Sequence, residues 1–129
     1  MEFNYPFAEL VGALTVRQIK EVKKPKNEVL LSDIQKISHD LDTLIKEKDL
    51  KLSAEFIRLI VYLTEMDCFI WACQDQMDEH PDKYSEWLTL KHQINGFRNQ
   101  IKGKIAEYVG DSNTHTNNSP DGLKWELSI

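Results

Sequence analysis

Four stretches of the chain carry apolar residues at the three- and four-residue spacing of an amphipathic α-helix. This periodicity restricts the fold more than any other feature, because a helix with one apolar face has to bury that face against another element. It predicts helices over residues 7–24, 28–48, 53–79 and 82–109. Short connections make neighbouring helices antiparallel. The predicted fold class is therefore all-α, an antiparallel four-helix arrangement.

Residues with strong positional preferences mark the ends of these helices. Pro6 favours a helix start, and Pro25 stops the first helix. Ser53 is a suitable N-cap for the third helix, and Gly110 a suitable C-cap for the fourth. The third and fourth helices, joined around residues 80–82, are expected to form a long central hairpin.

The third helix is expected to lie at the centre of the fold, because residues 56–63 are apolar on most faces of the helix. Cys68 and Cys73 follow in the same helix and point about 140° apart, so they cannot form a disulfide with each other. We interpret them as small core or near-core residues.

Both ends of the chain have a different pattern. Phe3, Tyr5 and Phe7 alternate with polar residues or proline, and apolar residues alternate with polar ones over 123–129. This alternation predicts short extended N- and C-terminal segments. A lone strand is unstable, so we expect them to pair with each other or with a neighbouring subunit. The predicted division is a helical domain over residues 1–110, and a polar loop with an extended C-terminal arm over residues 111–129.

Composition and charge disfavour several classes of protein. The net charge of -5 argues against binding of a nucleic-acid polymer, which needs a basic surface. The one basic cluster, residues 20–26, is interpreted first as the solvated end of the first helix, where lysines suit the helix dipole. Apolar runs are too short to span a membrane, and the first residues do not form a secretory signal. The predicted location is cytoplasmic, with no membrane partner.

No catalytic or cofactor motif is recognisable. The four histidines lack a glutamate three residues before them, and there is no His-Glu-x-x-His, no paired Cys-x-x-Cys and no glycine-rich phosphate loop. We therefore predict no catalytic residue, no metal site and no cofactor. A magnesium-dependent hydrolase is the least favoured function, because its carboxylates lack a known metal-binding spacing. These carboxylates are Glu9, Glu65, Asp67 and Asp75.

Polar residues run beside the apolar stripes of the predicted hairpin. If the chain reverses near residue 82, positions whose numbers sum to about 165 face each other. This register places Asp67 near Arg98 and Trp71 near Asn95. Acidic and basic side chains are therefore expected to face each other across a half-buried seam.

Two interpretations of this seam remain open. In the first, an ion pair fixes the register of two helices. In the second, Arg98 and Lys102, with Lys20, bind an anion, and Trp71 offers a stacking surface. The predicted ligand-binding residues are Lys20, Asp67, Trp71, Asp75, Asn95, Arg98 and Lys102.

Three stretches of the chain also match a known pattern in order and spacing. Residues 9–20 resemble a Glu-Leu-(Ile/Val)-Asp-(Lys/Arg)-Leu-(Thr/Ser)-Ile-x-x-(Ile/Leu)-Lys opening. The later stretches are Asp67-x-x-x-Trp71-x-x-Gln74-Asp75 and Asn95-Gly96-x-Arg98-x-x-x-Lys102-x-x-Ile105. They are similar to Asn-x-x-x-Trp-x-x-Glu-Asp and Asn-Asp-x-Arg-x-x-x-Lys-x-x-Ile helices of a family of uncharacterised all-helical bacterial and phage proteins, often encoded near glycosyltransferases. The resemblance implies a helical fold and a shared polar cluster, without a reaction.

The chain departs from that pattern at several of its acidic and amide positions. Gly12 stands where the pattern has aspartate, Asp67 where it has asparagine, Gln74 where it has glutamate and Gly96 where it has aspartate. Any acidic site that the family shares is therefore altered in this chain.

Together these features predict a non-enzymatic, oligomeric binding protein for a small anionic, nucleotide-like ligand. In a phage setting, such a protein would sequester a host signalling nucleotide. The alternative is a protein–protein adaptor or scaffold linked to envelope-sugar enzymes, which rests on the long hairpin and on the resemblance.

Overall fold

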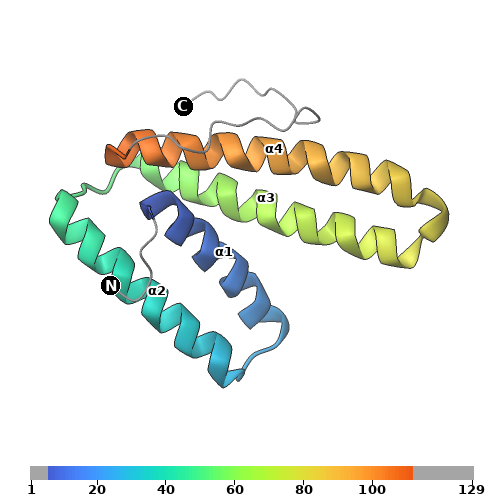
Figure 1. Cartoon of the computed structure of the whole chain (residues 1–129), viewed down its shortest axis with the longest axis horizontal. Helices are drawn as coiled ribbons and strands as arrows, with labels where there is room; N and C mark the ends of the chain where they lie inside the picture. The colour runs from blue at the N-terminus through green and yellow to red at the C-terminus, as the bar shows by residue number, and fades with distance from the viewer. Residues whose placement is uncertain (1–5, 112–129) are drawn as a thin grey trace.

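The computed structural model describes residues 6–111, and they form two helical hairpins (Figure 1). The first consists of α1 (Phe7–Lys23) and α2 (Glu28–Lys48), and the second of α3 (Ala54–Glu79) and α4 (Tyr84–Val109). A short 3₁₀ helix, η1 (Pro81–Lys83), connects α3 to α4. Within the described range there is no strand, which confirms the all-α prediction. The extended segments predicted at both chain ends lie outside the described residues, apart from Phe7, which is helical.

The helices begin and end close to the residues expected to mark them. Ser53 accepts a hydrogen bond from the Phe56 N–H at 3.1 Å and so caps α3. Asn27 caps α2 in the same way through the Leu30 N–H. Gly110 ends α4 with a φ of 80°, a conformation that glycine adopts without steric cost. The fourth helix starts two residues later than predicted, because Pro81–Lys83 forms the 3₁₀ turn.

The two hairpins cross each other (Figure 1). Helices α3 and α4 lie side by side along their whole length, and α1 packs against both of them. Helix α2 is the outermost helix and packs mainly on α1. The turn between α3 and α4 extends beyond the α1–α2 hairpin, so α1 and α2 do not pack around this tip.

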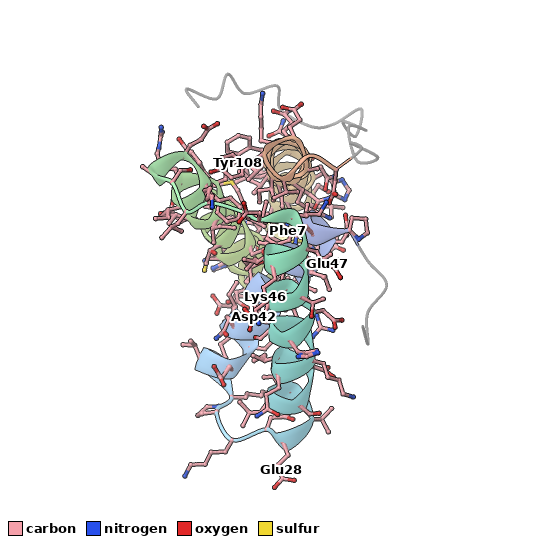
Figure 2. All side chains as sticks on the ribbon, turned by 90° about the vertical axis from the view of Figure 1, so that its left-hand side faces the viewer. Phe7, Glu28, Asp42, Lys46, Glu47 and Tyr108 are labelled. Atoms are coloured by element: carbon pink, nitrogen blue, oxygen red, sulfur yellow. The ribbon has the colours of Figure 1, made fainter. Side chains whose placement is uncertain are left out.

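The hydrophobic core reaches the opposite end, where α1 begins and α4 ends. Phe56 stacks on Tyr108 with ring centroids 4.9 Å apart, and Phe7 lies 6.0 Å from Phe56. Figure 2 shows Phe7 and Tyr108 at this end of the bundle. The fully buried apolar side chains of the core cluster are Leu10, Ile37, Leu59, Leu63, Ile101 and Ile105.

Asp111 closes this end of the bundle. Its carboxylate accepts a hydrogen bond from the Phe7 N–H at 3.3 Å, and its other oxygen forms an ion pair with Lys48. A carboxylate at a helix N-terminus is favoured by the helix dipole. Asp111, the first residue of the predicted polar loop, thus joins the start of α1 to the end of α2.

The prediction that residues 56–63 lie at the centre of the fold is wrong for one face of α3. Leu59 and Leu63 are buried, but Ile57 is 47% exposed and Val61 49% exposed. Helices α4 and α1 cover one side of α3 and leave its outer side open (Figures 1 and 2). For the same reason Cys68 is exposed, against expectation, while Cys73 is buried. Both cysteines are free thiols.

Candidate functional site

Asp67 is a buried carboxylate that three helices hold in place. It is 3% exposed on α3, and its Oδ1 accepts a hydrogen bond from Nε of Arg98 on α4. Its Oδ2 accepts one from the Thr15 hydroxyl on α1. Nη2 of Arg98 also lies 3.5 Å from the carbonyl oxygen of Gly12. A desolvated charge needs such partners, and both carboxylate oxygens of Asp67 have one.

A second ion pair lies one helical turn further along α4. Nζ of Lys102 is 2.7 Å from Oε1 of Glu9 on α1, and Lys102 is 8% exposed. We call the two ion pairs with their α1 neighbours the buried seam; its members are Glu9, Gly12, Thr15, Asp67, Arg98 and Lys102. Each cation in this seam is neutralised by a carboxylate and largely removed from water. The seam therefore holds α1 against α3 and α4.

The helical register agrees with the one expected from the sequence. The predicted pairing of Asp67 with Arg98 is confirmed. Two turns toward the hairpin tip, Nζ of Lys91 donates a hydrogen bond of 2.9 Å to Oε1 of Gln74, in the same register. Cys73 is buried beside this contact; burial raises the pKa of its thiol, and the positive charge of Lys91 opposes that effect.

The α1 side of the seam was not anticipated. Glu9 and Thr15 reach residues that lie more than 50 positions away in sequence, which helix periodicity cannot predict. Gly12 gave the available signal, because glycine within a helix is unfavourable unless something needs the space. A Cβ at position 12 would lie 3.0 Å from Nη2 of Arg98 and 3.7 Å from Cε of Lys102.

A separate groove, open to solvent, lies between α1, α2 and α3. Its volume is about 390 Å³, within the range of small-molecule sites. The end of α1 and the start of α2 form two sides of it, and an indole of α3 forms the third. The residues that line it are Lys20, Lys23, Lys24, Asn27, Val29, Leu30, Asp33 and Trp71. We call it the lysine groove.

Charge and aromatic surface meet in the lysine groove. Nζ of Lys23 lies 5.1 Å from the centre of the Trp71 ring, a cation–π distance, and 4.0 Å from Oδ2 of Asp75. Asp33 is engaged by Arg17 at 3.6 Å. Lys20 and Lys24 are exposed and form no ion pair with any residue in the described part of the chain. Two ammonium groups of this groove are thus available to a ligand.

The predicted ligand-binding residues therefore do not form one pocket. Asp67, Arg98 and Lys102 belong to the buried seam. Lys20 and Trp71 line the lysine groove, and Asp75 lies beside it. Asn95 is exposed on α4 and contributes to neither region.

The carboxylates of the hydrolase alternative are also spread apart. Glu9 and Asp67 pair with different cations of the seam, whereas Glu65 and Asp75 are exposed. Among residues 6–111 no group of three or more histidine, cysteine, aspartate or glutamate side chains could hold a metal ion. Within the same range no helix combines the length and apolar character needed to cross a membrane.

Comparisons with known proteins give one partial similarity. No family model matches the chain, and no solved structure matches it. The chain is 38% identical over 77 residues to the endonuclease MutS2 of Halalkalibacterium halodurans. That stretch is 57% of this chain but spans only 10% of the endonuclease. The similarity to such a small part of that protein assigns neither a family nor an activity to this chain.

Proposed function

We propose that this chain is a non-enzymatic, cytoplasmic binding protein for a small anionic, nucleotide-like ligand, which it holds in the lysine groove. The observation that carries the proposal is the meeting of Trp71 with Lys20, Lys23 and Lys24 around one groove. An indole can stack on a planar base, and ammonium groups attract phosphate oxygens. In a phage setting, such a protein would sequester a host signalling nucleotide.

The groove suits the two parts of such a ligand. Val29 and Leu30 add apolar surface near Trp71, which favours a flat ring. Lys20 and Lys24 lie at the rim with their charges exposed. The competing interpretation is a solvated helix end, since lysines at the C-terminus of α1 also suit the helix dipole. Measuring nucleotide binding distinguishes the two interpretations, because a solvated helix end would bind no nucleotide.

The buried seam has a supporting role in this proposal. Arg98 and Lys102 are neutralised by Asp67 and Glu9, so they position α1 against α3 and α4. This position sets the distance between the end of α1 and Trp71, and with it the width of the groove. The anion site proposed here thus differs from the one expected at Arg98 and Lys102.

A thermal-shift and calorimetry series tests the proposal. The probes are ATP, GTP, a cyclic dinucleotide, a sugar nucleotide, adenosine and inorganic pyrophosphate. A ligand at about 100 times its Kd stabilises the native state by about 2.7 kcal/mol. We expect a nucleotide to raise the Tm more than adenosine or pyrophosphate does, because each of those offers only one half of the recognised chemistry. The nucleotide is expected to remain intact.

Matched variants locate the site. Trp71→Leu and the pair Lys20→Ala with Lys24→Ala should each abolish the nucleotide response. Trp87→Leu and Lys46→Ala are the controls, because Trp87 lies outside the groove and Lys46 lies on the exposed side of α2 (Figure 2). Silence with every nucleotide, or a response that survives the groove variants, would overturn the proposal.

A second candidate function is that of a protein–protein adaptor, linked to envelope-sugar enzymes. The exposed apolar residues on the outer side of α3 favour it, because such surfaces often mark contacts between proteins. A chain that ignores all nucleotides but binds a sugar-transfer enzyme with micromolar affinity would establish this function instead.

A further inference from the structure

The outer side of α3 carries a regular row of exposed residues that no described helix covers. Ile57 and Val61 are about half exposed, and Phe69 is 44% exposed at the edge of the row. Three large apolar side chains are thus exposed on one side of a single helix, which indicates a contact surface more than scattered apolar residues do. The row has the four- and three-residue spacing of a coiled-coil seam over about five turns, with small or apolar side chains at four of its six positions and charged ones at the other two. Its members are Ala54, Arg58, Val61, Glu65, Cys68 and Ala72, all of them exposed.

The middle of this row is hollow and bears opposite charges. A shallow depression is lined by Ile57, Arg58, Val61, Tyr62 and Glu65. The Arg58 guanidinium lies 5.8 Å from the Tyr62 ring, on the side of Val61 toward the start of α3. The Glu65 carboxylate lies on the other side, one turn after Val61. An apolar centre between a cation and an anion is the pattern of a surface that can complement itself.

Orientation follows from these charges. In a parallel pair of α3 helices, Arg58 would face the partner's Arg58, and Glu65 the partner's Glu65, which is repulsive. In an antiparallel pair with its two-fold axis between Val61 and Tyr62, Arg58 comes within reach of the partner's Glu65, and Phe69 comes near the partner's Ala54. Small side chains, Ala54 and Ala72, lie toward the two ends of the row and allow the helices to approach closely.

We propose that a second copy of this chain binds here, through antiparallel packing of the outer faces of the two α3 helices. This deepens the oligomeric part of the predicted function and does not depend on the ligand. The row shares no residue with the lysine groove, so each dimer would carry two open grooves. A single pair of helices gives a small interface, and we therefore expect a dimer that dissociates on dilution.

Analytical ultracentrifugation of the full chain over a concentration series up to about 1 mM tests the proposal. The wild type should shift from monomer to dimer. Val61→Glu should remain monomeric, because it places two carboxylates at the centre of the interface. Val22→Glu is the matched control: Val22 is 82% exposed on α1, away from this row, and its replacement should leave the dimer intact. Circular dichroism checks that each variant is helical.

A charge exchange tests the antiparallel pairing itself. Arg58→Glu sets two anions against each other across the interface, and Glu65→Arg sets two cations, so each single change should raise the dimer Kd at least tenfold. The double variant restores opposite charges and should return the Kd to within about threefold of wild type, since each 1.4 kcal/mol corresponds to a factor of ten. An interface that depends only on the total charge would respond differently, because Glu65→Arg lowers the net negative charge of the chain and would then strengthen the dimer.

Three results would overturn the proposal. They are a wild-type chain that stays monomeric throughout the series, a dimer that survives Val61→Glu, and a double exchange that fails to recover. In the first case the face is covered by another segment of the chain or by a different protein. Nucleotide binding measured on monomeric Val61→Glu keeps the two proposals apart, because the lysine groove is complete in one copy.

Discussion

Two regions of this molecule carry lysine or arginine side chains with opposite properties. In the buried seam, Arg98 and Lys102 are each matched by a carboxylate and excluded from water. In the lysine groove, Lys20 and Lys24 are exposed and pair with no described side chain. Both regions lie along α1: the seam spans Glu9 to Thr15, and the groove begins at Lys20, near the end of the helix. The position of a lysine or arginine in a helical pattern thus does not show whether it forms a buried ion pair or stays open to a ligand. That depends on whether the other helices bring a carboxylate next to it.

The largest difference between the two regions should appear in stability. Arg98→Ala leaves the Asp67 carboxylate buried with only Thr15 as a partner. Breaking a buried ion pair in this way costs about 3–5 kcal/mol. Arg17→Ala is the control, because the ion pair with Asp33 is partly exposed and should contribute less than about 1 kcal/mol. Urea denaturation measures both, and equal losses would contradict the contrast between seam and surface.

The next largest effect on stability concerns which helix, α3 or α1, supplies the carboxylate that faces Arg98. Asp67→Asn removes a charge-assisted hydrogen bond and should cost about 2–3 kcal/mol. Adding Gly12→Asp should recover part of this loss, because position 12 directs a side chain toward Nη2 of Arg98 at 3.0 Å. The guanidinium end of Arg98 is flexible enough to move aside. The two substitutions also restore the residue types of the pattern that the chain resembles.

This double variant has a clear negative outcome. The double variant could lose as much unfolding free energy as the two single variants together. In that case a carboxylate on α1 cannot replace the one that α3 supplies in this chain. Gly12→Asn serves as the control, since it has the size of aspartate without the charge and should not rescue Asp67→Asn.

Local sequence signals were sufficient to predict the helices and the hairpin register. Pro25, Ser53 and Gly110 mark helix ends through their own backbone preferences, and one reversal point fixes which residues of α3 and α4 face each other. That register predicted the Asp67–Arg98 pair. The fold class followed from the same periodicity.

The rest depends on how α1 crosses the second hairpin, which periodicity does not encode. The positions of Glu9 and Trp71 relative to other helices are set by this crossing, and so is the separation of seam from groove. The open side of α3 was missed for a related reason. Residues 56–63 are apolar on most faces of the helix, so the sequence shows that the helix has apolar surface to bury without showing which face packs against a partner.

A moderate effect is expected at the second ion pair of the seam. Lys102→Ala should lower the free energy of unfolding by about 1–2 kcal/mol, less than Arg98→Ala. The Oε1 of Glu9 that faces Lys102 is buried, but the Glu9 side chain as a whole is 26% exposed, so water can reach the carboxylate once the lysine side chain is removed. Lys104→Ala, next to it in a more exposed pair with Glu107, should change stability by less than about 0.5 kcal/mol. If Lys102→Ala unfolds with the same free energy as wild type, the ion pair between Lys102 and Glu9 does not contribute to stability, and only that of Arg98 does.

The lysine groove should show the reverse behaviour. Lys20→Ala and Lys24→Ala lose only a favourable interaction with the helix dipole and should each lower stability by less than about 1 kcal/mol. The same variants should lose nucleotide affinity, measured by calorimetry. A large loss of stability would place these lysines with the seam and weaken the distinction between the two regions.

The smallest effect separates buried from exposed groups within α3. Burial raises the pKa of the Cys73 thiol and keeps its sulfur away from reagents, whereas Cys68 is exposed. At low protein concentration, where α3 is not packed against a second copy, a thiol reagent should modify Cys68 first.

The raised pKa of Cys73 also makes stability depend on pH. A raised pKa in the folded state stabilises the fold below the unfolded thiol pKa, and this contribution is lost as the pH rises through the folded value. As the pH is raised from about 8 to about 10, around the ordinary thiol pKa, the free energy of unfolding of Cys73→Ala should therefore fall less than that of wild type. The free energies of unfolding of wild type and Cys73→Ala could instead fall equally with pH, or the two thiols could react at equal rates. Either result would mean that the contact between α3 and α4 opens near Lys91, so that only the buried seam holds these helices together.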